Sequence, residues 1–274
     1  MALIGVWQAT GAVDRVQENL ARLDQTAVAA AGKGADILVT PELFATGYAP
    51  SRAASSDGDT IRERLAETAS RHHMALVAST VDHDGEETYI SASFFDAEGK
   101  ELTRYRKSQL FGLEEKSAFT PGTNAPELIQ YAGLRLALGI CYDVEFPEFV
   151  RAAARRGVDA LLIPTAVPAT GNVGGLPADR TYNAERISTL MVPCRAMENG
   201  LYIAYANHTV PNFTGLSCIS GPHGNVLAQA GHDEELLLAD IEALEVERAR
   251  RINTYLNDLR EDLEGSATVS DGRA

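Results

Sequence analysis

A cysteine lies at the end of an apolar segment, where a reactive thiol would be well placed. Cys141 stands in Gly139-Ile140-Cys141-Tyr142-Asp143, between a predicted strand over 134–140 and a predicted helix over about 147–156. Turns at strand ends are where α/β folds present reactive groups, and a thiol there can be exposed while backbone N–H groups and a nearby cation stabilise its thiolate. The position therefore favours a nucleophile, although a lone cysteine is more often a buried packing residue.

An acid and a cation also follow predicted strands. Glu42 comes after the apolar run 37–39 in mainly apolar surroundings, where desolvation would raise its pKa towards that of a proton-transfer group. Lys107 ends a predicted strand over 102–106, and the next segment supplies a second acid at Glu114 or Glu115. Taken alone, each acid is also explained as a loop residue, and Lys107 as a solvated cation. Together with a thiol they provide the nucleophile, the proton donor and the positive oxyanion partner that amide cleavage needs.

The other cysteines and the histidines indicate packing. Cys194 lies on the apolar face of a predicted helix and Cys218 in a predicted strand, so both are assigned to the core. The six histidines show no H-x-H or H-E-x-x-H spacing and are expected to be surface or packing residues, so no metal is predicted. The glycine-rich segment 171–175 has no following Lys-Ser/Thr, which argues against nucleotide binding.

Alternating strand and helix patterns predict the scaffold. Apolar residues recur at helical spacing from Val13 to Ala30, between apolar runs over 3–7 and 37–39 that are typical of buried parallel strands. No linker divides the chain, so one α/β domain over 1–264 with two similar halves is predicted, followed by a small, polar, frayed tail over 265–274. Further strands are predicted over 75–79, 89–96, 102–106, 134–140, 160–163, 201–206, 218–220, 226–229 and 236–241, helices over 60–71, 147–156 and 187–197, and loops over 112–122 and 165–178.

The composition restricts the classes of function. The chain has 274 residues, with 24 Lys+Arg and 38 Asp+Glu, and the resulting charge of −14 (24 − 38) argues against a nucleic-acid or anionic-membrane partner. The sequence starts without a basic leader and contains no run of about 18 apolar residues. Its three cysteines are widely spaced, which is untypical of a disulfide framework or zinc knuckle. These features predict a cytoplasmic protein.

The chemistry-bearing segments together resemble the motifs of the carbon-nitrogen hydrolase, or nitrilase, superfamily. Residues 41–48 are similar to the family's first Glu motif, 105–107 to its Lys motif and 139–148 to its Cys motif, in the family's order. The resemblance continues through 162–165 and 195–200 and covers the chain from residue 2 to about 241. Tyr142-Asp143 after the cysteine departs from the Cys-Trp-Glu of nitrilases and the Cys-Trp-Asp of carbamoylputrescine-type enzymes. The pattern looks most like that of aliphatic or stereoselective amidases.

This resemblance implies a fold and a catalytic set. The fold is a single-domain α-β-β-α sandwich of the nitrilase type, which commonly assembles into homodimers or larger homo-oligomers. Carried over to this sequence, the set makes Cys141 the nucleophile and Glu42 the general base that takes the thiol proton and later protonates departing ammonia. Lys107 stabilises the oxyanion.

Two further groups complete the implied site. The backbone N–H of Tyr142, next to the nucleophile, is the natural second oxyanion donor. A second Glu, which orients substrate and the hydrolytic water in family members, fits best at Glu115, with Glu114 as a competitor one residue away. Neither a metal nor another cofactor is implied.

The expected activity is hydrolysis of a small carboxamide to acid and ammonia through a thioester acyl-enzyme, with the amide and water as partners. The alternatives are an N-carbamoyl or ω-amide hydrolase of the same superfamily, a glutamine-amidotransferase-like cysteine enzyme and a catalytically silent binding protein of the same fold. Pro222-His223-Gly224 lacks the acid that an amidotransferase would need there. Substrate choice is expected to depend on 41–54, 112–121 and 165–182, where an inward-facing arginine would favour a carboxylate-bearing amide; the candidates are Arg180, Arg186 and Arg195.

Overall fold

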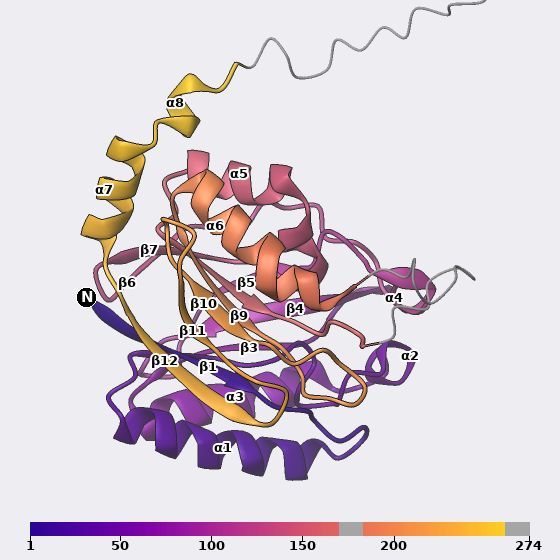
Figure 1. Ribbon diagram of the computed structural model, residues 1–274. Coiled ribbons are helices and arrows are strands. Elements are labelled where there is room, and N and C mark those ends of the chain that lie inside the picture. Colours follow the sequence, from indigo (N-terminus) through magenta and orange to yellow (C-terminus); the bar gives the residue numbers. More distant parts are fainter. Residues whose placement is uncertain (170–182, 261–274) are drawn as a thin grey trace, which may run out of the picture.

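The computed structural model describes residues 1–169 and 183–260, and within these ranges two six-stranded sheets lie face to face with helices on their outer sides (Figure 1). Buried side chains from both sheets form one apolar layer between them, to which Val39 and Val77 contribute from one sheet and Leu136 and Leu162 from the other. This is the α-β-β-α sandwich in a single domain that the sequence predicted.

The first sheet has the order β12-β1-β2-β3-β4-β5. Its centre, β1 to β3, is parallel, and β4, β5 and β12 run antiparallel to their neighbours. All three residues of β2 are buried, as expected for a parallel strand covered on both faces. The bounds are β1 Ala2–Gln8, β2 Ile37–Val39, β3 Ala75–Asp84, β4 Glu87–Phe95, β5 Glu101–Arg106 and β12 Glu235–Ile241.

The second sheet repeats this plan with the order β11-β10-β9-β8-β7-β6. Strands β7, β8 and β9 are parallel, while β6, β10 and β11 are antiparallel to their neighbours. The bounds are β6 Ile129–Tyr131, β7 Leu134–Leu138, β8 Ala160–Pro164, β9 Tyr202–Ala206, β10 Cys218–Ser220 and β11 Val226–Gln229.

Amphipathic helices cover the outer face of each sheet (Figure 1). Leu23 of α1 and Leu65 of α3 pack in the cluster below the first sheet, and Val150 of α5 and Ala196 of α6 pack above the second. The bounds are α1 Val16–Gly32, α2 Pro50–Ala53, α3 Gly58–His72, α4 Gly112–Ala118, α5 Pro147–Arg155, α6 Val192–Asn199, α7 Ala243–Ile252 and α8 Tyr255–Asp258, with a 3-10 helix η1 over Cys141–Glu145 and a π-helix η3 over Ile187–Met191.

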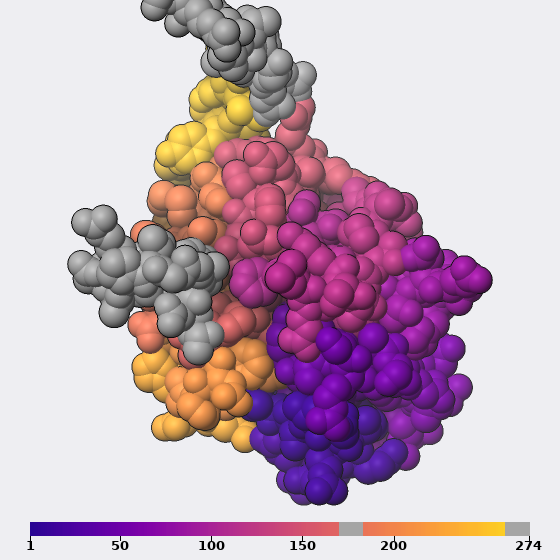
Figure 2. All heavy atoms as spheres, turned by 90° about the vertical axis from the view of Figure 1, so that its right-hand side faces the viewer, coloured from indigo at the N-terminus to yellow at the C-terminus, as the bar shows by residue number. Residues whose placement is uncertain are grey.

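Residues from the two ends of the sequence are joined in space. Figure 2 shows indigo atoms of the first residues beside orange atoms from much later in the chain. The Thr10 and Thr209 hydroxyls lie 2.8 Å apart, and Gln8 accepts a hydrogen bond from the Ser217 N–H at 2.8 Å. The two halves are therefore held together by polar contacts as well as by the shared apolar layer.

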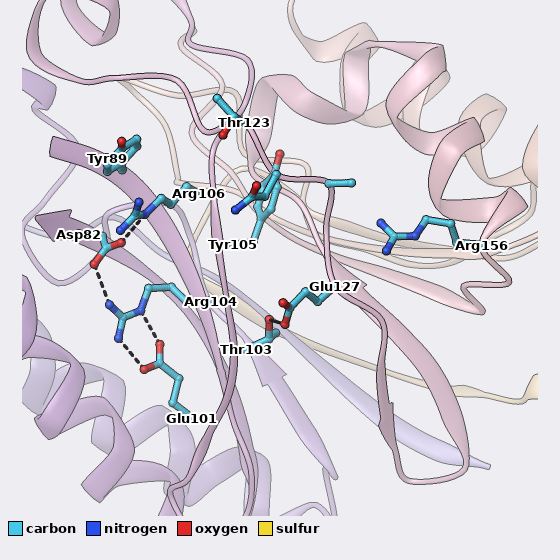
Figure 3. Close-up of a pocket in the computed structure, with 12 residues that line it drawn as sticks. Asp82, Tyr89, Glu101, Thr103, Arg104, Tyr105, Arg106, Thr123, Glu127 and Arg156 are labelled. Carbon is cyan, nitrogen blue, oxygen red and sulfur yellow. Dashed lines mark hydrogen bonds and ion pairs between the residues drawn. The ribbon is translucent and has the colours of Figure 1, made fainter. Parts of the chain in front are cut away.

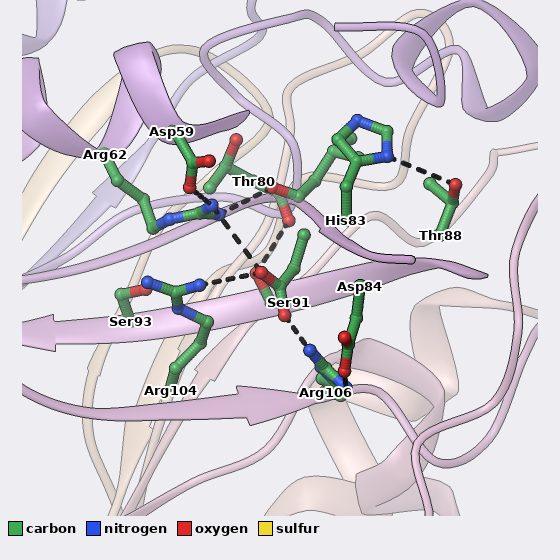
Figure 4. Close-up of polar contacts among 12 residues, drawn as sticks. Asp59, Arg62, Thr80, His83, Asp84, Thr88, Ser91, Ser93, Arg104 and Arg106 are labelled. Carbon is green, nitrogen blue, oxygen red and sulfur yellow. Dashed lines mark hydrogen bonds and ion pairs between the residues drawn. The ribbon is translucent and has the colours of Figure 1, made fainter. Parts of the chain in front are cut away.

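Paired charges hold the three-stranded edge of the first sheet (Figure 4). The Asp82 carboxylate of β3 is almost fully buried and accepts hydrogen bonds from Arg104 at 2.7 Å and Arg106 at 2.7 Å, both on β5. From α3, Arg62 donates to the Val81 carbonyl at 2.6 Å and to Asp59. The last residues before Lys107 are thus fixed to neighbouring elements.

Two local predictions were wrong. The segment 112–122 was predicted as a loop, but its first part forms α4, because Glu115 turns inward and pins the short helix. The predicted helix over 187–197 starts with a π-turn, whose extra residue rotates the buried face, so Leu190 and Met197 are exposed and Cys194 is only half-buried. Within the described ranges, none of the helices combines the length and the apolar character needed to cross a membrane. The predicted tail over 265–274 lies outside the described residues.

Candidate active site

The predicted catalytic residues stand where strands end, and the two facing sheets bring them together. Glu42 follows β2 by three residues and Lys107 directly follows β5, both in the first sheet. Cys141 starts η1 just after β7 in the second sheet, and the Glu42 N–H donates to the Thr165 carbonyl after β8 at 3.2 Å. The site is therefore built where the C-terminal ends of strands from both sheets meet.

Lys107 is the centre of the cluster. Its side chain is fully buried, and Nζ donates to Glu42 Oε1 at 2.7 Å and to Glu115 at 2.8 Å and 2.9 Å. Burial alone would lower the pKa of Lys107, but the neighbouring acids Glu42 and Glu115 raise it well above its usual value. Lys107 is therefore a permanent cation in this site.

The structure places Glu115, not Glu114, beside Lys107. Both Glu115 oxygens are occupied: Oε1 also accepts from the Tyr48 hydroxyl at 2.6 Å and Oε2 from the Phe111 N–H at 2.7 Å. Glu114 is exposed and contacts Ser51. The one-residue register that the sequence left open is thus fixed by which carboxylate points inward from α4.

Glu42 has one free oxygen. The residue is fully buried, and among the described residues no hydrogen-bond partner lies on Oε2, while Oε1 pairs with Lys107. Burial raises the pKa of Glu42 to about 8, aided by Glu115 and opposed by Lys107 and the Cys141 thiol. A carboxylate with a free oxygen and a pKa near neutrality is suited to exchanging a proton.

Cys141 is buried rather than exposed. Only 4% of the residue is accessible, and Sγ lies 3.6 Å from the Ala166 carbonyl. Burial raises the pKa of the thiol well above its usual value, and Glu42 and Glu115 add to this although Lys107 opposes it. The resting group is a neutral thiol and needs a base before it can attack. Its φ of 46° is in the left-handed region, so the surrounding structure must hold the turn in place.

Sequence reasoning missed three residues around the cluster. His208 was expected to be a surface or packing residue, yet its Nε2 lies 2.7 Å from the Glu42 carbonyl oxygen, and burial lowers its pKa to about 4, so the ring is neutral and donates. Tyr48 holds Glu115, and Asp143 contacts the segments of both Lys107 and Cys141. The signal for His208 was its position just after a buried strand, and for the other two their place in the quoted motifs.

The arginines considered for substrate binding are engaged, exposed or undescribed. Arg195 donates to Glu198 at 3.0 Å and to the Glu145 carbonyl at 2.9 Å, and Arg186 is exposed. Arg180 and the 171–175 segment lie outside the described residues. Among the described residues, no group of His, Cys, Asp and Glu could hold a metal ion.

A separate cavity of about 830 Å³ runs along β5 (Figure 3). Four of its charged side chains are ion-paired, because Arg104 and Arg106 bind Asp82, and Arg104 also binds Glu101. No nucleophilic thiol lines it. The cavity is therefore distinct from the buried cluster of Glu42, Lys107 and Cys141.

Comparisons with known proteins agree with the geometry. The family model for carbon-nitrogen hydrolases matches residues 3–251. A 2-oxoglutaramate amidase of Bacillus subtilis is 31% identical, covering 84% of this chain and 87% of its own length. A protein of Pseudomonas protegens described as a hydrolase in the pqqF 5' region is 34% identical over 90% of this chain and 85% of its own.

A solved amidase structure from Nesterenkonia sp. AN1 has the same fold. It is 37% identical, covers 96% of this chain and 98% of its own, and superposes with a TM-score of 0.84. That structure shows a mutant after Michael addition of acrylamide at the active-site cysteine. Another structure of the same amidase shows the acetamide moiety of fluoroacetamide added at that cysteine.

Proposed function

This chain belongs to the carbon-nitrogen hydrolase family, and we propose that it hydrolyses a small carboxamide to the carboxylic acid and ammonia through a thioester on Cys141. The observation that carries the proposal is the buried Lys107 ammonium between the Glu42 and Glu115 carboxylates, beside a neutral thiol. Cations and carboxylates are rarely buried together unless they are paired, and here one carboxylate oxygen stays free. Such an arrangement favours catalysis over a purely structural role.

Acylation uses Glu42 as a proton carrier. The free Glu42 oxygen takes the thiol proton as the sulfur attacks the amide carbon, which forms the C–S bond and a tetrahedral oxyanion. Lys107 and the backbone N–H of Tyr142 stabilise this oxyanion; Tyr142 lies in the first turn of η1, where N–H groups have no partner within the helix. Glu42 then gives its proton to the nitrogen, the C–N bond breaks and ammonia leaves.

In deacylation Glu42 carries a proton again, now from water to the departing thiolate. Glu42 removes a proton from water, which attacks the thioester carbon; the C–S bond breaks and the thiol regains its proton. We assign Glu115 to holding Lys107, because four donated hydrogen bonds already occupy the acceptor capacity of its carboxylate. This differs from the sequence expectation that Glu115 orients the hydrolytic water.

An ω-amide is the second candidate substrate, favoured by the similarity to a 2-oxoglutaramate amidase. Against it, the described arginines named above either bind protein groups or face solvent. A neutral small amide is therefore our first choice.

We further propose that the protein forms a homodimer, which light scattering would show as twice the mass of one chain. We also propose a cytoplasmic location, in keeping with the three free thiols.

The test is ammonia release from a panel of aliphatic amides, ω-amides of dicarboxylic acids, carbamoyl amines and one nitrile. Wild type is compared with Cys141→Ala, and Cys194→Ala serves as the matched thiol control because Cys194 is half-buried and outside the cluster. We expect release from a neutral amide by wild type and the control, and none by Cys141→Ala. Turnover by Cys141→Ala would contradict the mechanism, and a best substrate with a carboxylate would move the assignment to ω-amides.

A further inference from the structure

Asp143 is a buried carboxylate to which the proposed mechanism gives no task. It lies two residues after Cys141, is fully buried, and accepts four hydrogen bonds, which is the capacity of a carboxylate. The donors to Oδ1 are Ser108 Oγ at 3.0 Å and the Gln109 N–H at 2.9 Å, and the donors to Oδ2 are the Tyr105 hydroxyl at 3.0 Å and the Ile140 N–H at 3.0 Å.

These donors come from both sides of the site. Three belong to β5 and the residues after it, on either side of Lys107, and the fourth is the residue before Cys141. The carboxylate thus joins the segment that carries the ammonium to the turn that carries the thiol. The Tyr105 hydroxyl also lies 2.8 Å from Ser108 Oγ, so these two donors approach the carboxylate side by side.

The Cys141 backbone needs such support. Its φ of 46° is unfavourable for a residue with a side chain and persists only where neighbouring contacts hold it. The Asp143 N–H donates to the Ile140 carbonyl at 3.0 Å, while the Asp143 carboxylate accepts from the Ile140 N–H. The residue before the nucleophile is therefore held through both of its backbone polar groups.

We propose that Asp143 is a positioning residue that fixes the Lys107 ammonium relative to the Cys141 thiol by joining their two segments. The proposal rests on the function proposed above for those two groups. It assigns Asp143 no contact with substrate. What it predicts is a loss in the rate of the chemical steps, because reacting groups are misplaced, with little change in substrate binding.

Asp143→Asn is the variant of choice because it keeps the shape and removes the negative charge. An amide presents one NH₂ group, which would face two donors wherever it is placed. We expect kcat for ammonia release to fall by about 10²-fold, the effect that a displacement of about 1 Å between reacting groups can have, with KM almost unchanged. Alkylation of Cys141 by iodoacetamide, followed by mass spectrometry, should slow in the same variant.

Asp159→Asn is the matched control. Asp159 is also buried and accepts from the backbone N–H of Arg135 at 2.8 Å and from the Arg135 guanidinium at 2.7 Å. It lies at the start of β8, the opposite end of the strand from the cluster. We expect this variant to lose stability but to keep the kcat and the alkylation rate of wild type. Equal losses in both variants would mean a general effect of removing a buried carboxylate and would overturn the proposal.

Two variants keep the test decisive if Asp143→Asn does not fold. Tyr105→Phe and Ser108→Ala each remove one donor and leave the carboxylate, and each should lower kcat less than Asp143→Asn with KM unchanged. Wild-type kcat in both, or in a folded Asp143→Asn, would sink the proposal. If wild type releases no ammonia from any amide, the proposed function fails, whereas the alkylation rates still decide whether Asp143 positions the thiol.

Discussion

At the scale of single residues, one ammonium holds two buried carboxylates. Lys107→Ala should lower kcat by roughly 10²–10³-fold because an oxyanion donor is lost. It should also lower the free energy of unfolding by about 3–5 kcal/mol, since Glu42 and Glu115 would lose their buried partner. Ammonia release and urea unfolding measure the two effects. A variant that kept wild-type stability would show that the pairing does not stabilise the fold.

The pKa of Glu42 predicts the pH dependence of activity. The base must be ionised to take the thiol proton, and its pKa is raised to about 8 by burial. We expect kcat/KM to rise as pH increases towards about 8 and then to level off. The measurement is ammonia release between pH 5 and pH 9.5 at subsaturating amide. An acidic limb near the ordinary glutamate value would assign the titration to another group.

The raised pKa of Glu42 also predicts how stability depends on pH: stability should fall as pH rises, whereas activity should rise. Because the folded pKa of Glu42 lies above its ordinary value of 4.5, its contribution to stability is complete below about pH 4.5 and is lost as pH rises through about 8. Glu42→Gln lacks this titration. The free energy of unfolding of wild type relative to the variant should therefore fall by at most about 1.4 kcal/mol per pH unit in that window. A difference that stays constant with pH would contradict the raised pKa.

Glu115 and Glu114 provide a matched pair of adjacent acids. Glu115→Gln should lower kcat markedly, because an amide nitrogen would face the Lys107, Tyr48 or Phe111 donors. Glu114→Gln should leave kcat unchanged, because its carboxylate is exposed and contacts only Ser51 among the hydrogen bonds described. Steady-state ammonia release compares them. A larger loss in Glu114→Gln would move the role by one residue.

The limits of sequence reasoning at this scale have a physical cause. Glu42, Lys107 and Cys141 could be singled out because each follows a predicted strand and because the segments around them together resemble the motifs of one family; each residue alone also had a packing or loop explanation. Glu115 could not be separated from Glu114, because only the orientation of α4 decides which of two adjacent side chains points inward. His208 was missed because a lone histidine has no spacing partner in the sequence; its partner is the backbone of a residue 166 positions away.

At the scale of elements, the end of β5 depends on one close backbone approach. The Gly122 N–H donates to the Lys107 carbonyl at 2.7 Å, and a Cβ at Gly122 would lie 2.3 Å from the Arg106 carbonyl oxygen. Gly122→Ala should push this strand end away, lower stability by about 1–3 kcal/mol and reduce kcat through displacement of Lys107. Thermal unfolding and ammonia release test both effects.

Gly32→Ala is the control for that substitution. Gly32 ends α1, its φ is not positive, and nothing lies within 4 Å of a Cβ built there. Alanine should therefore be neutral or slightly stabilising at this position. Equal damage in both variants would contradict a specific role for the approach of Gly122 to β5.

Several short strands were predicted with the bounds that the structure has, including the exposed strand over 226–229. The strands over 37–39 and 218–220 also match, and all of their residues are buried. The predicted helix over 187–197 is present, but its predicted buried face is wrong. Its apolar residues fit an ideal α-helical period, whereas the π-turn of η3 shifts that period and leaves Ser188 and Asn199 buried instead. A sequence pattern cannot show an inserted residue whose position is set by tertiary packing.

At the scale of the molecule, the last strand completes the first sheet. Residues Ala2 to Gln8 of β1 pair one by one with Ile241 to Glu235 of β12, so the first sheet closes only after most of the chain is present. Removing β12 would expose the polar backbone of β1 and the apolar layer beneath it, to which Leu237 and Ile241 contribute. The two halves are therefore one cooperative unit.

Truncation from the C-terminus tests this dependence. A chain ending at Glu264 lacks only the small, polar residues 265–274 and keeps β12, so it should keep the thermal midpoint and kcat of the full chain. A chain ending at Glu234 loses the pairing of β1 and should not fold into an active, monodisperse protein. Circular dichroism, light scattering and ammonia release compare the two. An active protein ending at Glu234 would show that the first sheet closes without β12, and a loss of activity at Glu264 would place a function in the tail.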